Sequence, residues 1–191
     1  MNRYGARELA ASFRTVRKNT IAIAEDIAAD KYGFRPTPDV MSVGEQLAHV
    51  AVAPGWQIFV QGEHVTHIDF ALFGMYATRR AAEEKALTTK DDILKALRDR
   101  GEQFAAFLES LSEDTLDEVV TFQPPIEPAT KTRFEMLLGV KEHEMHHRAQ
   151  LMLFERLLGI VPHLTRRREA FRASMQTQGQ AQQPQAQAQG A

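Results

Sequence analysis

His143 and His147 are the residues whose types and spacing most directly suggest chemistry, because they lie four residues apart in a segment that predicts a helix. A capping-box sequence beginning at Thr132 predicts the start of this helix, and Gly159 predicts its end. Side chains four residues apart lie on the same helix face, so both imidazoles can reach one ion. Neutral imidazole binds zinc, nickel, iron and copper. The pair is therefore a candidate metal site.

The same helix face is otherwise apolar, which indicates the inward side of a helical bundle. Its members recur at steps of four and three: Met136, Val140, His143, His147, Gln150, Phe154 and Leu157. Polar groups buried without partners cost roughly 2–7 kcal/mol each, so something must satisfy the two histidines. Two interpretations follow: the histidines bind a metal, or they form hydrogen bonds with facing polar side chains or buried water. Gln150 can hold a water or a substrate at the metal, or it can fill the core through hydrogen bonds.

Glu144 lies between the two histidines and completes a pattern found in zinc proteases. In that interpretation Glu144 is a general base, and a third ligand has to come from downstream, where Glu155 and Glu169 are the acidic candidates. Glu144 also lies four residues before Arg148, which predicts an ion pair on the helix surface. We favour the ion pair and keep the base as the alternative.

The composition limits the class of protein. The 191 residues carry a net charge of −2 and no cysteine, which excludes disulfides, thiolate metal ligands and a cysteine nucleophile. No basic face predicts nucleic-acid binding, and no apolar stretch approaches the ~18 residues of a membrane span. The N-terminus lacks the apolar core of a signal peptide. We expect a cytoplasmic protein that binds neither nucleic acid nor membrane.

Four amphipathic segments predict an all-α fold, a four-helix bundle. Pro54 predicts a break in the second segment, and Gly101 on the core side of the third predicts close approach by another helix. The segments cover residues 6–29, a stretch from Ser42 onward, Thr89–Leu111 and 132–159.

The remaining segments predict connections and a tail. Residues 61–87 predict a long crossover connection with short helical pieces, and Val119–Phe122 predicts a short extended segment before a proline-rich loop. The end of the chain is rich in Gln and Ala and has few large apolar residues. We therefore expect one domain over residues 1–172 and a disordered tail over residues 173–191.

Two separated stretches carry a family resemblance. His49 follows the helix start Ser42-Val43-Gly44-Glu45, and the last helix contains His143-Glu144-Met145-His146-His147-Arg148-Ala149-Gln150. Together they resemble the DinB/YfiT-like four-helix-bundle proteins, and the likeness covers nearly the whole chain except the tail. It implies that His49, His143 and His147 hold a divalent metal ion (zinc, nickel or iron) in the bundle core. His146 is then a neighbour of the site, not a ligand.

The resemblance also implies a function. Three histidine ligands leave a coordination position open, which is typical of a catalytic metal site. The implied protein is a metal-dependent enzyme, a thiol-dependent transferase or a hydrolase of a small molecule, with Glu144 and Gln150 as candidate catalytic residues. Its expected partners are the substrate, a low-molecular-weight thiol and a second copy in a homodimer. The alternative is a non-catalytic, stress-related bundle or dimerisation module with a structural metal or no metal.

Overall fold

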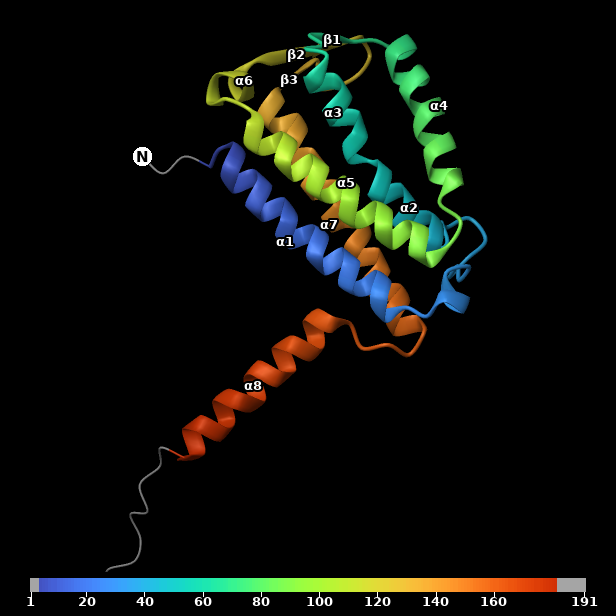
Figure 1. Cartoon of the computed structure of the whole chain (residues 1–191), viewed down its shortest axis with the longest axis vertical. Helices are drawn as coiled ribbons and strands as arrows, with labels where there is room; N and C mark the ends of the chain where they lie inside the picture. The colour runs from blue at the N-terminus through green and yellow to red at the C-terminus, as the bar shows by residue number, and fades with distance from the viewer. Residues whose placement is uncertain (1–3, 182–191) are drawn as a thin grey trace, which may run out of the picture.

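Long helices that lie side by side make up most of this computed structural model, which describes residues 4–181 (Figure 1). Helix α1 packs against α5 and α7, and α2 and α3 pack against the same two helices. The mostly helical fold predicted from the sequence is confirmed. The bounds of these elements are α1 (Ala6–Asp26), α2 (Val43–Val52), α3 (Pro54–Gly62), α5 (Lys90–Ser110) and α7 (Arg133–Leu157).

The predicted starts of two helices are confirmed by their capping contacts. The Ser42 hydroxyl accepts from the backbone N–H of Glu45 at 3.2 Å, and Thr132 does the same for Glu135 at 3.2 Å. Pro54 separates α2 from α3 as predicted, because proline has no backbone N–H to continue the α2 ladder and suits the first turn of a new helix.

A small sheet is the correction to the all-α prediction. Strand β2 (Val119–Phe122) lies between β1 (His67–Ile68), which runs parallel to it, and β3 (Thr130–Thr132), which runs antiparallel. The sheet covers the end of the helices where α7 begins (Figure 1). The extended segment at Val119–Phe122 was predicted, but its partner strands are too short to show a pattern of their own.

Helix α4 (Phe70–Ala86) replaces the short helical pieces predicted for residues 61–87. Asp69 caps it, with a carboxylate oxygen 2.7 Å from the N–H of Leu72. Of its residues only Tyr76 is fully buried, so the apolar periodicity that reveals a packed helix is weak here. This helix packs against α2 and so brings its own polar side chains towards His49. Between α5 and β2 lies the short α6 (Glu113–Asp117), and η1 (Ala29–Lys31) follows α1.

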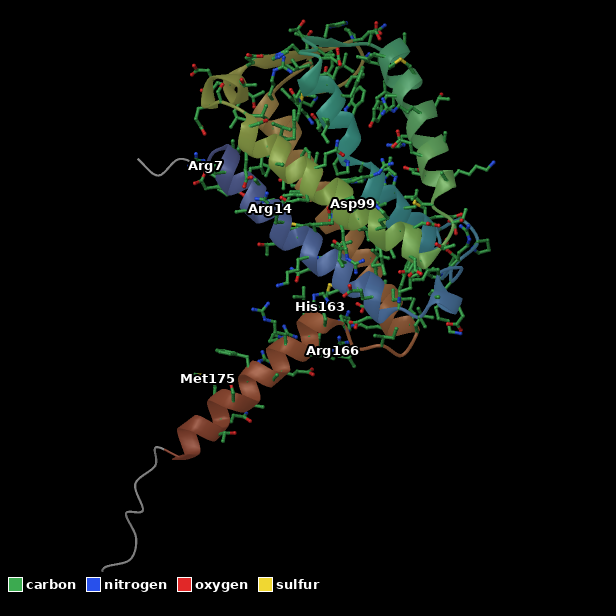
Figure 2. The ribbon with its side chains drawn as sticks, in the orientation of Figure 1. Arg7, Arg14, Asp99, His163, Arg166 and Met175 are labelled. Carbon is green, nitrogen blue, oxygen red and sulfur yellow. The ribbon has the colours of Figure 1, made fainter. Side chains whose placement is uncertain are left out.

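Helix α8 (His163–Ala181) extends away from the body of the molecule (Figure 1). At its start Arg166 donates to Asp26 at 2.6 Å, while Met175 lies far out on the projecting part (Figure 2). The disordered tail predicted over 173–191 is wrong for residues 173–181, which continue this helix; residues 182–191 lie outside the described residues. Alanine, arginine, methionine and glutamine favour a helix even where no apolar face is buried. None of the helices in residues 4–181 has the length and apolar character needed to cross a membrane.

Candidate metal centre

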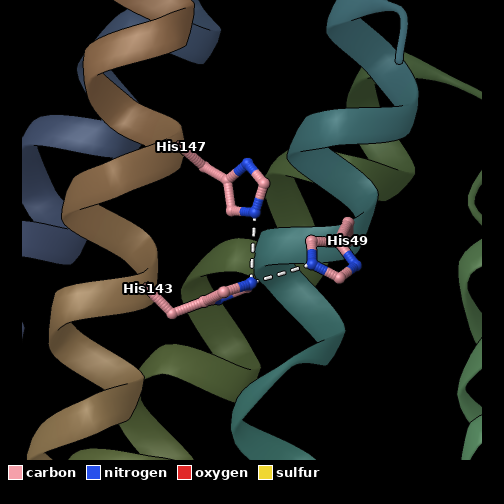
Figure 3. Close-up of side chains that lie close together, drawn as sticks. All are labelled: His49, His143 and His147. Atoms are coloured by element: carbon pink, nitrogen blue, oxygen red, sulfur yellow. Dashed lines mark hydrogen bonds between the residues drawn. The ribbon is translucent and has the colours of Figure 1, made fainter. Parts of the chain in front are cut away.

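Three imidazole rings meet between α2 and α7. His49 comes from α2, and His143 and His147 come from successive turns of α7 (Figure 3). The Nε2 atom of His143 lies 2.9 Å from Nε2 of His49 and 3.1 Å from Nε2 of His147. One ring nitrogen from each histidine lies within 4.8 Å of the other two. The structure thus brings together the three residues that the sequence predicted as ligands.

A carboxylate on α4 orients His49. Oε1 of Glu84 lies 2.8 Å from Nδ1 of His49. An ionised carboxylate can only accept, so Nδ1 carries the proton and the lone pair of a neutral His49 is at Nε2, facing His143. Metal-binding histidines are commonly held in this way by a carboxylate on the other ring nitrogen. Glu84 is also 3.3 Å from Nε of Arg80, one turn earlier on α4.

Two glutamines surround the outer nitrogen of His147. Nδ1 of His147 lies 3.0 Å from Oε1 of Gln150 and 3.0 Å from Nε2 of Gln46, and Gln46 also donates to Gln150. When Nδ1 donates to Gln150, the lone pair of His147 is at Nε2 and faces the other rings. Gln150 therefore positions His147, and its other end lies 3.2 Å from the exposed His146. This places His146 beside the site and not in it, as predicted.

The three rings suit a metal ion chemically. A tetrahedral zinc ion with Zn–N distances near 2.0 Å spaces its ligand nitrogens roughly 3.3 Å apart. The distances of 2.9 and 3.1 Å from Nε2 of His143 to the other two rings are close to this value. Burial, and then the neighbouring charges of His147 and His49, lower the pKa of His143 to about 4. Burial likewise lowers the pKa of His147. Neutral imidazole is the form that binds metals, so the residues present fit a divalent ion.

Glu144 is engaged in a buried ion pair and not in the histidine cluster. Its carboxylate accepts from Nε and one terminal nitrogen of Arg17 at 2.8–3.0 Å, and both side chains are almost wholly buried. Arg17 also donates to the backbone carbonyls of Leu97 and Val50. The predicted surface ion pair of Glu144 with Arg148 is therefore wrong: Glu144 pairs with Arg17 inside the protein. With both oxygens engaged by Arg17, the zinc-protease interpretation loses its base.

The downstream carboxylates do not supply a ligand either. Within the described residues, the cluster of side chains that can hold a metal contains the three histidines and no acidic group. Glu155 is buried on the last turns of α7, and Glu169 is exposed on α8.

A cavity of about 310 Å³ adjoins the metal centre at His143. His143 forms part of its wall, so a molecule in the cavity lies beside the metal site. Four aromatic side chains from α3, α4 and β2 also line it: Trp56, Phe73, Tyr76 and Phe122.

Several residues of this site were missed in the sequence. Gln46 lies one turn before His49 on the same helix, a spacing that could have revealed it. Glu84 and Arg80 had no such signal, because α4 shows little periodicity and its packing against α2 is a long-range contact.

The chain belongs to the DinB superfamily, whose family model matches residues 12–151. It is 24% identical over 157 residues to the uncharacterized protein YjoA of Bacillus subtilis (strain 168), covering 81% of this chain and 91% of YjoA.

Two solved structures resemble the fold. The crystal structure of YjoA, described as a DinB-like protein, matches with a TM-score of 0.60 and covers 80% of this chain and 92% of that one. An uncharacterized protein from Clostridium difficile 630 matches with a TM-score of 0.61 at 10% identity, covering 82% of this chain and 98% of that one. The overall fold is thus shared with both proteins.

Proposed function

We propose that the chain is a metal-dependent enzyme in which His49, His143 and His147 hold a divalent ion, zinc, nickel or iron. The observation that carries this proposal is the convergence of three ring nitrogens, with His49 oriented by Glu84 and His143 forming part of the wall of a cavity. A purely structural histidine cluster has no need of an adjoining cavity of ligand size.

The reaction class that fits best is thiol-dependent transfer, or hydrolysis, of a small molecule. A divalent ion supplies Lewis-acid chemistry, because it favours the deprotonated form of a thiol or water that it binds. Glu84 fixes the ring of His49, and Gln150, which accepts a hydrogen bond from Gln46, fixes the ring of His147. We assign Gln150 this positioning role. Glu144 holds the helices together through Arg17 and takes no part in proton transfer.

One observation favours the non-catalytic alternative. Nε2 of His143 lies within hydrogen-bond distance of both other rings, and Glu84 and Gln46 reach the outer nitrogens of His49 and His147, so hydrogen bonds alone can satisfy part of this cluster without a metal. In that case the protein is a stress-related bundle or dimerisation module.

We also interpret α1, the α2–α3 pair, α5 and α7 as the four helices of a DinB-like bundle, with α4 in the long connection. Their mutual packing supports this assignment. The homodimer and the cytoplasmic location stay predictions of the sequence.

An activity assay tests the proposal. Protein loaded with zinc, nickel or iron is incubated with monochlorobimane and either glutathione or cysteine, and with p-nitrophenyl esters for hydrolysis. We expect metal-dependent turnover that His147→Ala abolishes and His146→Ala retains, since His146 lies beside the site. Equal turnover by His147→Ala and the parent, or no turnover with any probe and metal, contradicts the proposal.

A further inference from the structure

The cavity beside His143 has aromatic walls and a small volume. The Trp56 ring on α3 lies 4.9 Å from that of Tyr76 and 6.1 Å from that of Phe73, both on α4, measured between ring centroids. About 310 Å³ is at the lower end of the range of roughly 300–1,000 Å³ for ligand pockets. Such a space suits a small molecule with a flat or apolar body.

A buried chain of hydrogen bonds fixes the orientation of the Gln57 side-chain amide on the cavity wall. Arg133, which can only donate, donates to Oε1 of Gln61 at 2.5 Å. The amide nitrogen of Gln61 must then be the atom that donates to Oε1 of Gln57 at 2.7 Å. Gln57 is 7% exposed and lines the cavity, and its amide nitrogen has no hydrogen-bond partner elsewhere in residues 4–181. The cavity is thereby given a fixed N–H donor.

Most of the charged side chains on the cavity wall are cations that donate hydrogen bonds. Arg80 and Lys131 both line the cavity. Arg80 meets Glu84 only through its Nε, at 3.3 Å, and this contact is not a well-formed hydrogen bond. The acidic residue on the wall, Glu135, is engaged by the backbone N–H and hydroxyl of Thr132 in the α7 cap, at 2.7 and 2.9 Å. An anionic group entering the cavity meets two cations, an amide donor and one carboxylate, that of Glu135, whose Oε2 is held in the α7 cap.

We propose that the cavity binds a small carboxylate with an aromatic or similarly flat apolar body, and that this molecule is the substrate acted on beside His143. The aromatic walls hold the body, while Gln57, Arg80 and Lys131 recognise the carboxylate. The claim that this molecule is a substrate rests on the proposed function. Its binding to the cavity does not require the metal.

The test uses the chain's single tryptophan, Trp56, which lines the cavity and reports on ligands by its fluorescence. Benzoate is titrated into metal-loaded and metal-free protein, beside benzamide, its uncharged isostere. We expect benzoate to bind both forms at least about tenfold more tightly than benzamide, since a charge-assisted hydrogen bond contributes enough for such a ratio.

Variants of the wall separate this proposal from simple binding at a metal. Arg80→Gln and Lys131→Gln should each weaken benzoate about tenfold and leave benzamide unchanged. Gln57→Glu keeps the bond from Gln61 but replaces the donor with an anion, so it should favour benzamidine over benzoate. Arg79→Gln is the matched control, because Arg79 lies on the same helix but pairs with Glu83 outside the cavity.

The proposal is overturned if benzamide binds as tightly as benzoate, if neither changes the Trp56 signal, or if the three wall variants bind benzoate like the parent. It is also overturned if metal-free protein and His147→Ala lose all benzoate binding, because the carboxylate then binds the ion alone. A protein that takes up no metal but still selects benzoate refutes the proposed function and not this inference.

Discussion

Replacing Glu144 with glutamine should cost much of the protein's stability and none of its metal. Glu144 and Arg17 are 1% and 4% exposed, and Arg17 adds hydrogen bonds to two backbone carbonyls. Glu144→Gln leaves the guanidinium buried without its counter-charge, and removing one partner of such a pair costs about 3–5 kcal/mol. For a chain of this size, each kcal/mol shifts the Tm by about 2–4 °C. We therefore expect the Tm to fall by roughly 6–20 °C.

Thermal unfolding and urea titration measure this loss, with Glu142→Gln as the matched control, since Glu142 is exposed on the same helix. Replacing both partners, Arg17→Met with Glu144→Leu, should destabilise less than Glu144→Gln alone, because no charge is then left unpaired. Metal content should equal that of the parent in every folded variant. A Glu144→Gln protein with an unchanged Tm but no activity would refute the reasoning and restore Glu144 as a base.

Three further predictions concern other parts of the structure. Glu84→Ala should weaken metal binding about 10–100-fold in a chelator competition, because it frees the His49 ring; unchanged affinity would remove Glu84 from the site. Burial raises the pKa of Glu155 from 4.5 to about 7, and neither of its oxygens has a partner within the described residues. Ionising this group therefore lowers stability as the pH rises from about 4.5 to 7, so Glu155→Gln should stabilise the fold in urea titrations at pH 8 and not at pH 4.5. The same gain at both pH values would contradict this. Gly101→Ala should lower the Tm, because the new Cβ would lie 2.8 Å from Cγ of the pinned Arg17, whereas Gly74→Ala, in open space on α4, should raise it; a higher Tm for both would show that Arg17 moves aside.

The local features of this fold could be read from the sequence. The capping boxes at Ser42 and Thr132, and the break at Pro54, depend on residues within a few positions of one another. Gly101 was predicted to permit close approach, and its neighbour is the Arg17 side chain of α1. The two histidines of α7 follow from helical spacing alone, while His49 came from the family resemblance.

The features that the sequence did not show depend on distant contacts or on an exposed helix. Glu144 was paired with Arg148 on the rule for neighbours four apart, but its true partner is 127 positions away. Glu84 reaches His49 from a helix with a single fully buried residue, so no apolar stripe indicated it. The direction of the Gln57 amide is set by Arg133 through Gln61, and no local pattern encodes such a chain.

Elemental analysis of the purified protein, never exposed to chelator, tests the central claim most directly. The parent and His146→Ala should each carry one equivalent of a divalent metal, and His147→Ala should carry almost none. No metal in the parent, even after incubation with zinc, nickel or iron, would contradict the account and make the three histidines polar groups of the core.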